Sequence, residues 1–250
     1  MDSQTLIFVL AAMMFVAVTV FGYVPLGLNL SSVRLKQFTA IGAGILIGSA
    51  FLVIIPEGLE ILEDHVEHTM IGLVILCGFA LMLLLETFGL PHAVHHDEDK
   101  DLLGLSATIG LIVHAVVDGL AVGASVSSST ETGLIVFAAV LLHKGPAAFG
   151  LSSFLQHIQI DRANSQMYLI LFALSSPVVA ILSFFALKDT SLATDDNLGL
   201  ALMFSAGTFI YVATVDVLPE VHNHDHENES PTLFVILGMI LVFLTTLISH

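Results

Sequence analysis

Apolar residues form long runs along almost the whole chain, and short polar segments separate the runs. Most runs approach the roughly 20 residues that an α-helix needs to cross a bilayer. The pattern predicts an all-α, polytopic membrane protein with eight transmembrane helices in a single domain, 1–250. We expect these spans at residues 6–26, 38–56, 70–89, 102–125, 133–156, 167–187, 198–218 and 232–248.

Composition supports the membrane assignment and narrows the class of partner. Of the 250 residues, 56% are hydrophobic and only 11% are charged, against about 25% charged residues in a soluble domain. The formal net charge of −16, with only six basic residues, argues against nucleic acid and anionic lipid head groups as partners and favours a cation. The first run lacks the basic segment of a cleaved signal peptide, so we interpret it as a retained span.

The few basic residues predict how the helices are oriented. Arg34, Lys36, Lys100 and Arg162 fall in odd-numbered loops, whereas Lys188 falls in an even-numbered loop. Because loops rich in Lys and Arg stay in the cytosol, we expect the odd loops there and both termini on the lumenal or extracellular side.

Two apolar segments resemble each other. AGILIGSAFLVIIPE (43–57) and AGTFIYVATVDVLPE (206–220) match at six of fifteen positions. They close the second and the seventh spans, which run in opposite directions in this topology. Inverted repeats are a recurring plan of secondary transporters, with the substrate site at the repeat interface. Glu57 and Glu220, which end the two segments, are candidates for the entrance and the exit of a pore.

Two loops, 91–101 and 220–230, are rich in histidine, and both are expected on the cytosolic side. Imidazole and carboxylate side chains gathered in this way favour weak capture of a metal ion. A solvated polar loop without a metal is the alternative. The candidate capture residues are His92, His95, His96, His222, His224 and His226.

Ionisable residues at membrane depth are costly and are therefore candidates for function. His114 and Asp118 lie four residues apart in the fourth span and so share one helix face. His143 lies on a stripe of small residues in the fifth span, which predicts close packing of the two helices. We expect the two imidazoles and the carboxylate to bind zinc or another divalent metal. The alternative is that they only form hydrogen bonds between helices.

Pro146 of the fifth span cannot donate a hydrogen bond to the carbonyl of Leu142, and we expect the freed carbonyl to line a polar path. The sequence contains no G-x-x-x-x-G-K-[ST] loop, so transport along such a path is expected to be passive or secondary. The competing function classes are an intramembrane zinc hydrolase, with a metal-activated water, and a zinc-linked membrane receptor.

These residues resemble the ZIP (Zrt/Irt-like) family of zinc transporters. HAVVDG (114–119), HKGPAAFG (143–150) and SAGTFIYVATVDVLPEV (205–221) are similar to the family's helices 4, 5 and 7, and look closest to the ninth-member animal subfamily. The resemblance implies a 3+2+3 inverted repeat around helices 4 and 5, zinc movement toward the cytosol, a homodimer, and a trans-Golgi or plasma-membrane location. It also implies His114, Asp118 and His143 as metal ligands, and Asp216 as a ligand of a second metal.

The chain departs from the family's pattern around that second metal. Ala115 stands where a polar residue is frequent, Lys144 where an acid is common, and Ala147 where a glutamate is common. We therefore predict one tight zinc site, in which the Lys144 ammonium, beside Asp118 and Asp216, replaces a second cation. The alternative is that Lys144 only anchors helix packing through a salt bridge.

Overall fold

The computed structural model contains helices and no strand within the residues that it describes, which are 2–28, 31–62, 66–89, 98–188, 190, 194–222 and 231–249. The helices are α1 (Ser3–Gly27), α2 (Ser32–Ser49), η1 (Ala50–Ile54), α3 (Ile55–Leu62), α4 (His68–Gly89), α5 (Glu98–Ser128), α6 (Thr130–His157), α7 (Arg162–Leu187), α8 (Asp195–Tyr211), η2 (Val212–Val217), α9 (Leu218–His222) and α10 (Pro231–Ser249).

Seven of the helical stretches in these described ranges are long and apolar enough to cross a membrane. They coincide with the first seven predicted spans, and α2, η1 and α3 together form the second. The eighth predicted span coincides with α10, whose apolar part, Pro231–Leu247, is shorter than the other seven. The chain is therefore an integral, multi-pass membrane protein.

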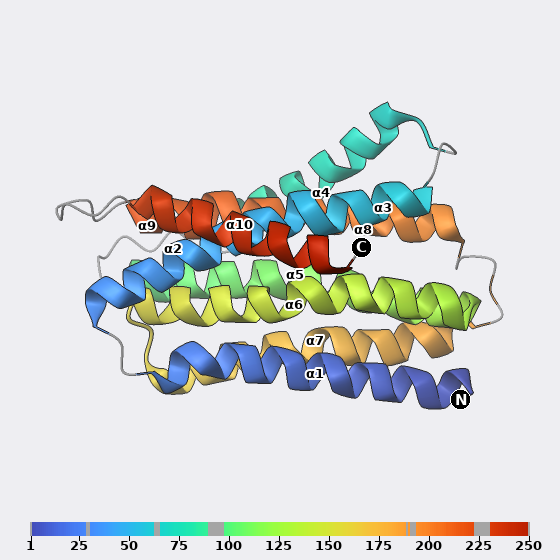
Figure 1. Ribbon diagram of the computed structural model, residues 1–250, viewed down its shortest axis with the longest axis horizontal. Coiled ribbons are helices and arrows are strands. Elements are labelled where there is room, and N and C mark those ends of the chain that lie inside the picture. The colour runs from blue at the N-terminus through green and yellow to red at the C-terminus, as the bar shows by residue number, and fades with distance from the viewer. Residues whose placement is uncertain are drawn as a thin grey trace.

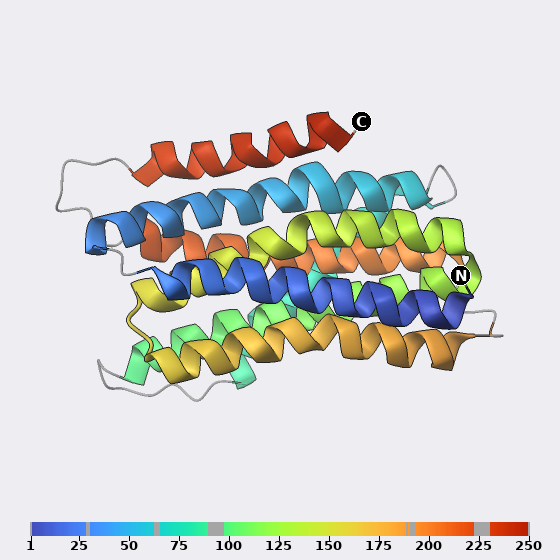
Figure 2. The ribbon, with the colours of Figure 1, turned by 60° about the horizontal axis from the view of Figure 1, so that its bottom comes forward.

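The helices are arranged around α5 and α6, which lie in the middle of the bundle (Figure 1). On one side α1 packs against α6, and α7 packs against α5. On the other side α2 packs against α6, and α8 packs against α5, while α10 and α4 lie outside α2 and α8 respectively. The first helix begins and the last helix ends toward the same end of the bundle, as the turned view also shows (Figure 2).

A very short connection sets the register between the two central helices. Only Ser129 separates the end of α5 from the start of α6, and its side chain caps α6 by accepting a hydrogen bond from the Thr132 backbone N–H at 3.0 Å. The two helices are therefore antiparallel neighbours. His114 and His143 lie almost equally far from this turn, about 21 Å along each helix at 1.5 Å per residue. The connection thus brings both histidines to the same depth.

Glycines allow two pairs of helices to pack backbone against backbone. A Cβ atom on Gly44 of α2 would lie 1.9 Å from the carbonyl oxygen of Val235 in α10. A Cβ atom on Gly207 of α8 would lie 2.0 Å from the carbonyl oxygen of Ile75 in α4. Only glycine fits such close helix contacts. Gly44 and Gly207 occupy equivalent positions in the two similar segments.

The same two segments each contain a π-helical stretch, η1 and η2. The Ile55 N–H donates to the carbonyl of Ala50, and the Leu218 N–H donates to the carbonyl of Ala213, which are equivalent bonds in the two segments. A proline follows each donor. Because its ring clashes with the carbonyl four residues earlier, a widened turn just before the proline relieves the clash.

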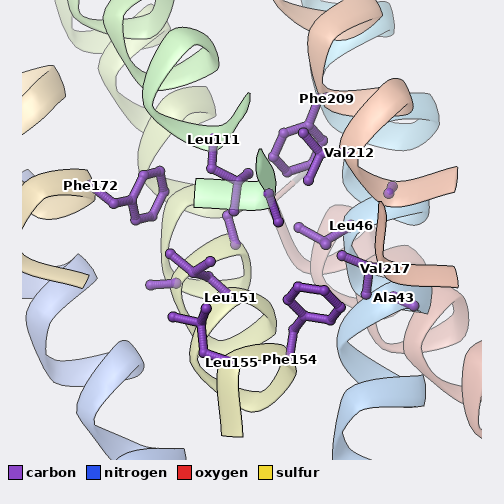
Figure 3. Packing of buried hydrophobic residues seen from close by; sticks show 14 of the residues in the cluster. Ala43, Leu46, Leu111, Leu151, Phe154, Leu155, Phe172, Phe209, Val212 and Val217 are labelled. Carbon is purple, nitrogen blue, oxygen red and sulfur yellow. The ribbon is translucent and has the colours of Figure 1, made fainter. Parts of the chain in front are cut away.

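Buried apolar side chains from helices throughout the bundle fill the space around the central pair (Figure 3). They include Leu46 of α2, Leu111 of α5, Phe154 of α6, Phe172 of α7 and Phe209 of α8. Large apolar side chains also cover the outside; Leu233 is 69% exposed and Leu182 is 63% exposed. An outer surface this apolar is unusual for a soluble monomer and suits contact with lipid.

Candidate metal centre

Three of the predicted ligands meet where α5 packs against α6. One ligand atom each from His114, Asp118 and His143 all lie within 4.8 Å of one another. His114 Nε2 is 3.1 Å and His143 Nε2 is 3.2 Å from Asp118 Oδ2. Ligand atoms that share a tetrahedral zinc ion lie about 3.3 Å apart, because each is about 2.0–2.1 Å from the metal. The two nitrogen–oxygen separations are close to this value, so each imidazole and the carboxylate are spaced to share a zinc ion.

Lys144 places a cation on the same carboxylate oxygen. Its Nζ is 2.9 Å from Asp118 Oδ2 and 5.2 Å from the centroid of the Phe172 ring, and the side chain is only 1% exposed. The carboxylate and the face of the aromatic ring both stabilise a buried ammonium. Asp118 is therefore the common partner of two imidazoles and one fixed positive charge.

Helix α8 closes the centre with two residues that the sequence analysis did not single out. The Ser205 hydroxyl oxygen lies 2.7 Å from His114 Nδ1 and donates a hydrogen bond to Asp118 Oδ1 at 3.1 Å. The Phe209 ring lies against His114, with centroids 4.3 Å apart. The sequence signal that could have identified them is the spacing of Ser205 and Phe209, because residues four apart share one face of a helix.

The centre is closed from both ends of the bundle in this conformation. His114 and Asp118 have no exposed surface, and His143 and Lys144 are 1% exposed. Water is therefore displaced from the ligands, which strengthens the electrostatic interactions among them. An ion enters or leaves such a site only when the surrounding helices move.

Asp216 does not belong to this group of ligands. It is buried in η2, and its Oδ2 has no hydrogen-bond partner in the described part of the chain. Its acidic neighbour is Glu86 of α4, which accepts a hydrogen bond from the Tyr211 hydroxyl. The expected contact between Lys144 and Asp216 is not present in this conformation. A role for Asp216 in binding metal stays a prediction.

Most of the other predicted site residues lie where the structure describes no side chain. Glu57 is described, and is half-buried in the first turn of α3. The backbones of Glu220 and His222 belong to α9, but their side chains are outside the described part. The remaining candidates for metal capture, His92, His95, His96, His224 and His226, lie outside the described residues.

The polar path expected at Pro146 stays a prediction. Helix α6 continues without a break through Pro146. The side chain of Leu142 is 42% exposed, whereas that of His143 is buried. The Leu142 side chain therefore lies on the outer face of α6, whereas the neighbouring His143 side chain lies on the inner face.

Comparison with known proteins places this centre in a family. A family model described as ZIP Zinc transporter matches residues 4–102 and 91–246. Zinc transporter ZIP9 of Micropogonias undulatus is 40% identical, with 91% of this chain and 89% of that protein covered. Zinc transporter ZIP9-A of Xenopus laevis is also 40% identical, with 92% and 89% covered. The matches extend over the helices that hold the metal centre and over both similar segments. The chain therefore belongs to the ZIP zinc transporter family.

Proposed function

We propose that this chain is a secondary or passive transporter that moves zinc into the cytosol, together with other divalent metals that prefer the same ligands. The observation that carries the proposal is the buried group of His114, Asp118 and His143, held at one depth by the hairpin of α5 and α6. The names of the ZIP9 relatives support zinc as the substrate.

The ion is held by two neutral imidazoles and one carboxylate, a combination that suits zinc. His114 and His143 supply nitrogen from different helices, and Asp118 supplies the oxygen between them. Because the site is closed, transport requires a second conformation in which the same residues open to the cytosol. The Phe209 ring excludes water from the imidazoles until that change occurs.

One zinc ion occupies the site, and Lys144 stands in for a second cation. The 2.9 Å ion pair between Lys144 and Asp118 supports this part of the proposal. The measurement is zinc bound per protomer in the parent chain, compared with the chain that carries His114→Ala. Zinc held by the histidine-rich loops contributes equally to both values, so subtracting one from the other leaves only the zinc bound at the site. A difference of one supports the tethered cation, and a difference of two contradicts it.

The fold is a 3+2+3 inverted repeat, in which spans one to three and six to eight flank α5 and α6. Three observations support this arrangement: the equivalent π-helical stretches η1 and η2, the equivalent close contacts at Gly44 and Gly207, and the matching helix pairs. In those pairs α2 with α10 corresponds to α8 with α4, and α2 with α6 corresponds to α8 with α5. The transport site then lies at the interface of the two repeats.

Zinc flux into proteoliposomes tests the function. We expect uptake by the parent chain, loss of uptake in His114→Ala and in Asp118→Ala, and normal uptake in His68→Ala, which removes an exposed histidine outside the site. Uptake that survives both site substitutions contradicts the proposed site. Zinc binding without uptake favours the hydrolase or the receptor. Assembly as a homodimer and residence in the trans-Golgi or plasma membrane stay expectations from the resemblance.

A further inference from the structure

Ser205 touches the candidate ligands from a helix that supplies none of them. Its hydroxyl oxygen lies 2.7 Å from His114 Nδ1 and 3.1 Å from Asp118 Oδ1, and its backbone carbonyl oxygen lies 3.4 Å from the same Nδ1. Its side chain is fully buried. Ser205 therefore links α8 to both ligands of α5 at once.

The chemistry of these contacts fixes the proton on His114. A backbone carbonyl and an ionised carboxylate only accept hydrogen bonds, and a hydroxyl has a single proton to donate. All the contacts are satisfied when His114 Nδ1–H donates to Ser205 and the Ser205 hydroxyl donates to Asp118 Oδ1. The Nε2 atom of His114 then carries a lone pair.

The other side of the imidazole agrees with this assignment. His114 Nε2 has no hydrogen-bond partner among the residues described, although it lies 3.1 Å from Asp118 Oδ2. A nitrogen lone pair that faces a carboxylate oxygen at this distance forms half of a cation site rather than a hydrogen bond. Zinc binds neutral imidazole through the ring nitrogen that carries no proton, which in this tautomer is Nε2.

We propose that Ser205 is a positioning residue of the transport site. It holds His114 in the Nδ1–H tautomer, aims Nε2 at the ion, and makes zinc affinity depend on the position of α8 relative to α5. This inference rests on the proposed function. Partners that orient a metal-binding histidine in this way typically contribute 10- to 100-fold to affinity.

Two serines of α7 show that a buried hydroxyl against α5 does not by itself have this role. The Ser176 hydroxyl donates to the carbonyl of Ala115 at 2.6 Å, and the Ser183 hydroxyl lies 3.3 Å from the carbonyl of Gly119. Both bond to backbone rather than to a ligand. Ser176→Ala is therefore a matched control, because it removes an equally buried hydroxyl that bonds to the residue next to His114.

Zinc binding to the purified full chain in nanodiscs is the first test, measured by competition with a zinc chelator. We expect Ser205→Ala to weaken binding about 10- to 100-fold, while Ser176→Ala binds zinc like the parent chain. If Ser205→Ala binds zinc as tightly as the parent chain while His114→Ala loses binding, the role of Ser205 is overturned but the proposed function is not. Binding that also survives His114→Ala overturns the proposed function.

The second test takes its main result from the parent chain, so it does not depend on the folding of Ser205→Ala. Nitrogen NMR of the metal-free parent chain, with labelled histidine, reports which ring nitrogen carries the proton, and the His114 signals are those missing in His114→Gln. We expect a protonated Nδ1 and a bare Nε2 in the parent chain and in Ser176→Ala. A protonated Nε2 in the parent chain overturns the inference. In folded Ser205→Ala we expect the preference for Nδ1–H to be lost, and its persistence also overturns the inference.

Discussion

Replacing Asp118 with Asn removes the charge at the centre of the site while preserving the size of the side chain. In the parent chain Asp118 Oδ2 lies 2.9 Å from Lys144 Nζ and 3.2 Å from His143 Nε2, and Oδ1 accepts from Ser205 at 3.1 Å. Asn cannot neutralise the ammonium. Asp118→Asn therefore leaves Lys144, only 1% exposed, as a buried cation with no anionic partner in this group.

The burial of both partners sets the expected size of the effect. Removing one partner of a buried ion pair costs about 3–5 kcal/mol, which lowers the ratio of folded to unfolded protein roughly 10²- to 10⁴-fold. Removing both charges leaves no uncompensated ion, and exchanging a buried pair for apolar groups is often neutral or stabilising. We therefore expect the double variant Asp118→Asn/Lys144→Met to recover most of the lost stability.

Stability and transport then separate the two roles of Asp118. The chain has no tryptophan, so unfolding in detergent is followed by circular dichroism, and zinc uptake is measured in proteoliposomes. We expect the double variant to be stable but inactive, because the oxygen ligand is still missing. Zinc uptake restored in the stable double variant would refute the assignment of Asp118 as a ligand. Unchanged stability of Asp118→Asn would refute the estimate for the buried pair.

Three further outcomes are expected. Gly78→Ala should lower the unfolding midpoint, because the new Cβ would lie 2.2 Å from the carbonyl oxygen of Phe204 and overpacking costs about 1–3 kcal/mol. The control Gly72→Ala, in the same helix, has open space around it and should leave the midpoint unchanged. Equal midpoints for the two variants would contradict the contact. Phe209→Ala should destabilise by about 3–5 kcal/mol, as for other buried phenylalanines, which a denaturant titration detects. Zinc uptake should fall as the medium is acidified, because protons compete with the metal for imidazole; flux that rises steadily with acidity would contradict imidazole ligation.

The helices and the main ligands were predictable because their signals are local. A run of apolar residues specifies a span without reference to any other part of the chain. The four-residue spacing of His114 and Asp118 specifies a shared face in the same way. The contact of these residues with His143 depends on one additional feature, the turn at Ser129. A turn this short leaves the antiparallel register of α5 and α6 almost no freedom.

The partners of Lys144 and Asp216 were harder to predict because they depend on contacts between helices distant in sequence. Both residues lie within predicted spans, and opposite charges at that depth favoured a pair. In the structure Lys144 contacts Asp118, whereas Asp216 lies near Glu86. The π-helical stretch η2 contains Asp216 and changes the direction in which the following residues point. A period of 3.6 residues applied along the whole span does not describe that change.

Among the positions at which the two proposed repeats differ, one lies at the metal centre and suggests unequal roles for the repeats. Gly42 in α2 and Ser205 in α8 are equivalent in the repeat, and each faces a central helix. Gly42 approaches Gly150 of α6, where a Cβ atom would lie 3.0 Å from the Gly150 Cα. Ser205 instead contacts the ligands of α5. A shift of α2 along α6 therefore disturbs this packing and the hydrogen bond from the Thr39 hydroxyl to the Ser153 carbonyl, neither of which involves a ligand. A shift of α8 along α5 instead removes the hydrogen bonds that orient His114. We therefore expect movement of α8 relative to α5 to couple opening of the site to release of the ion.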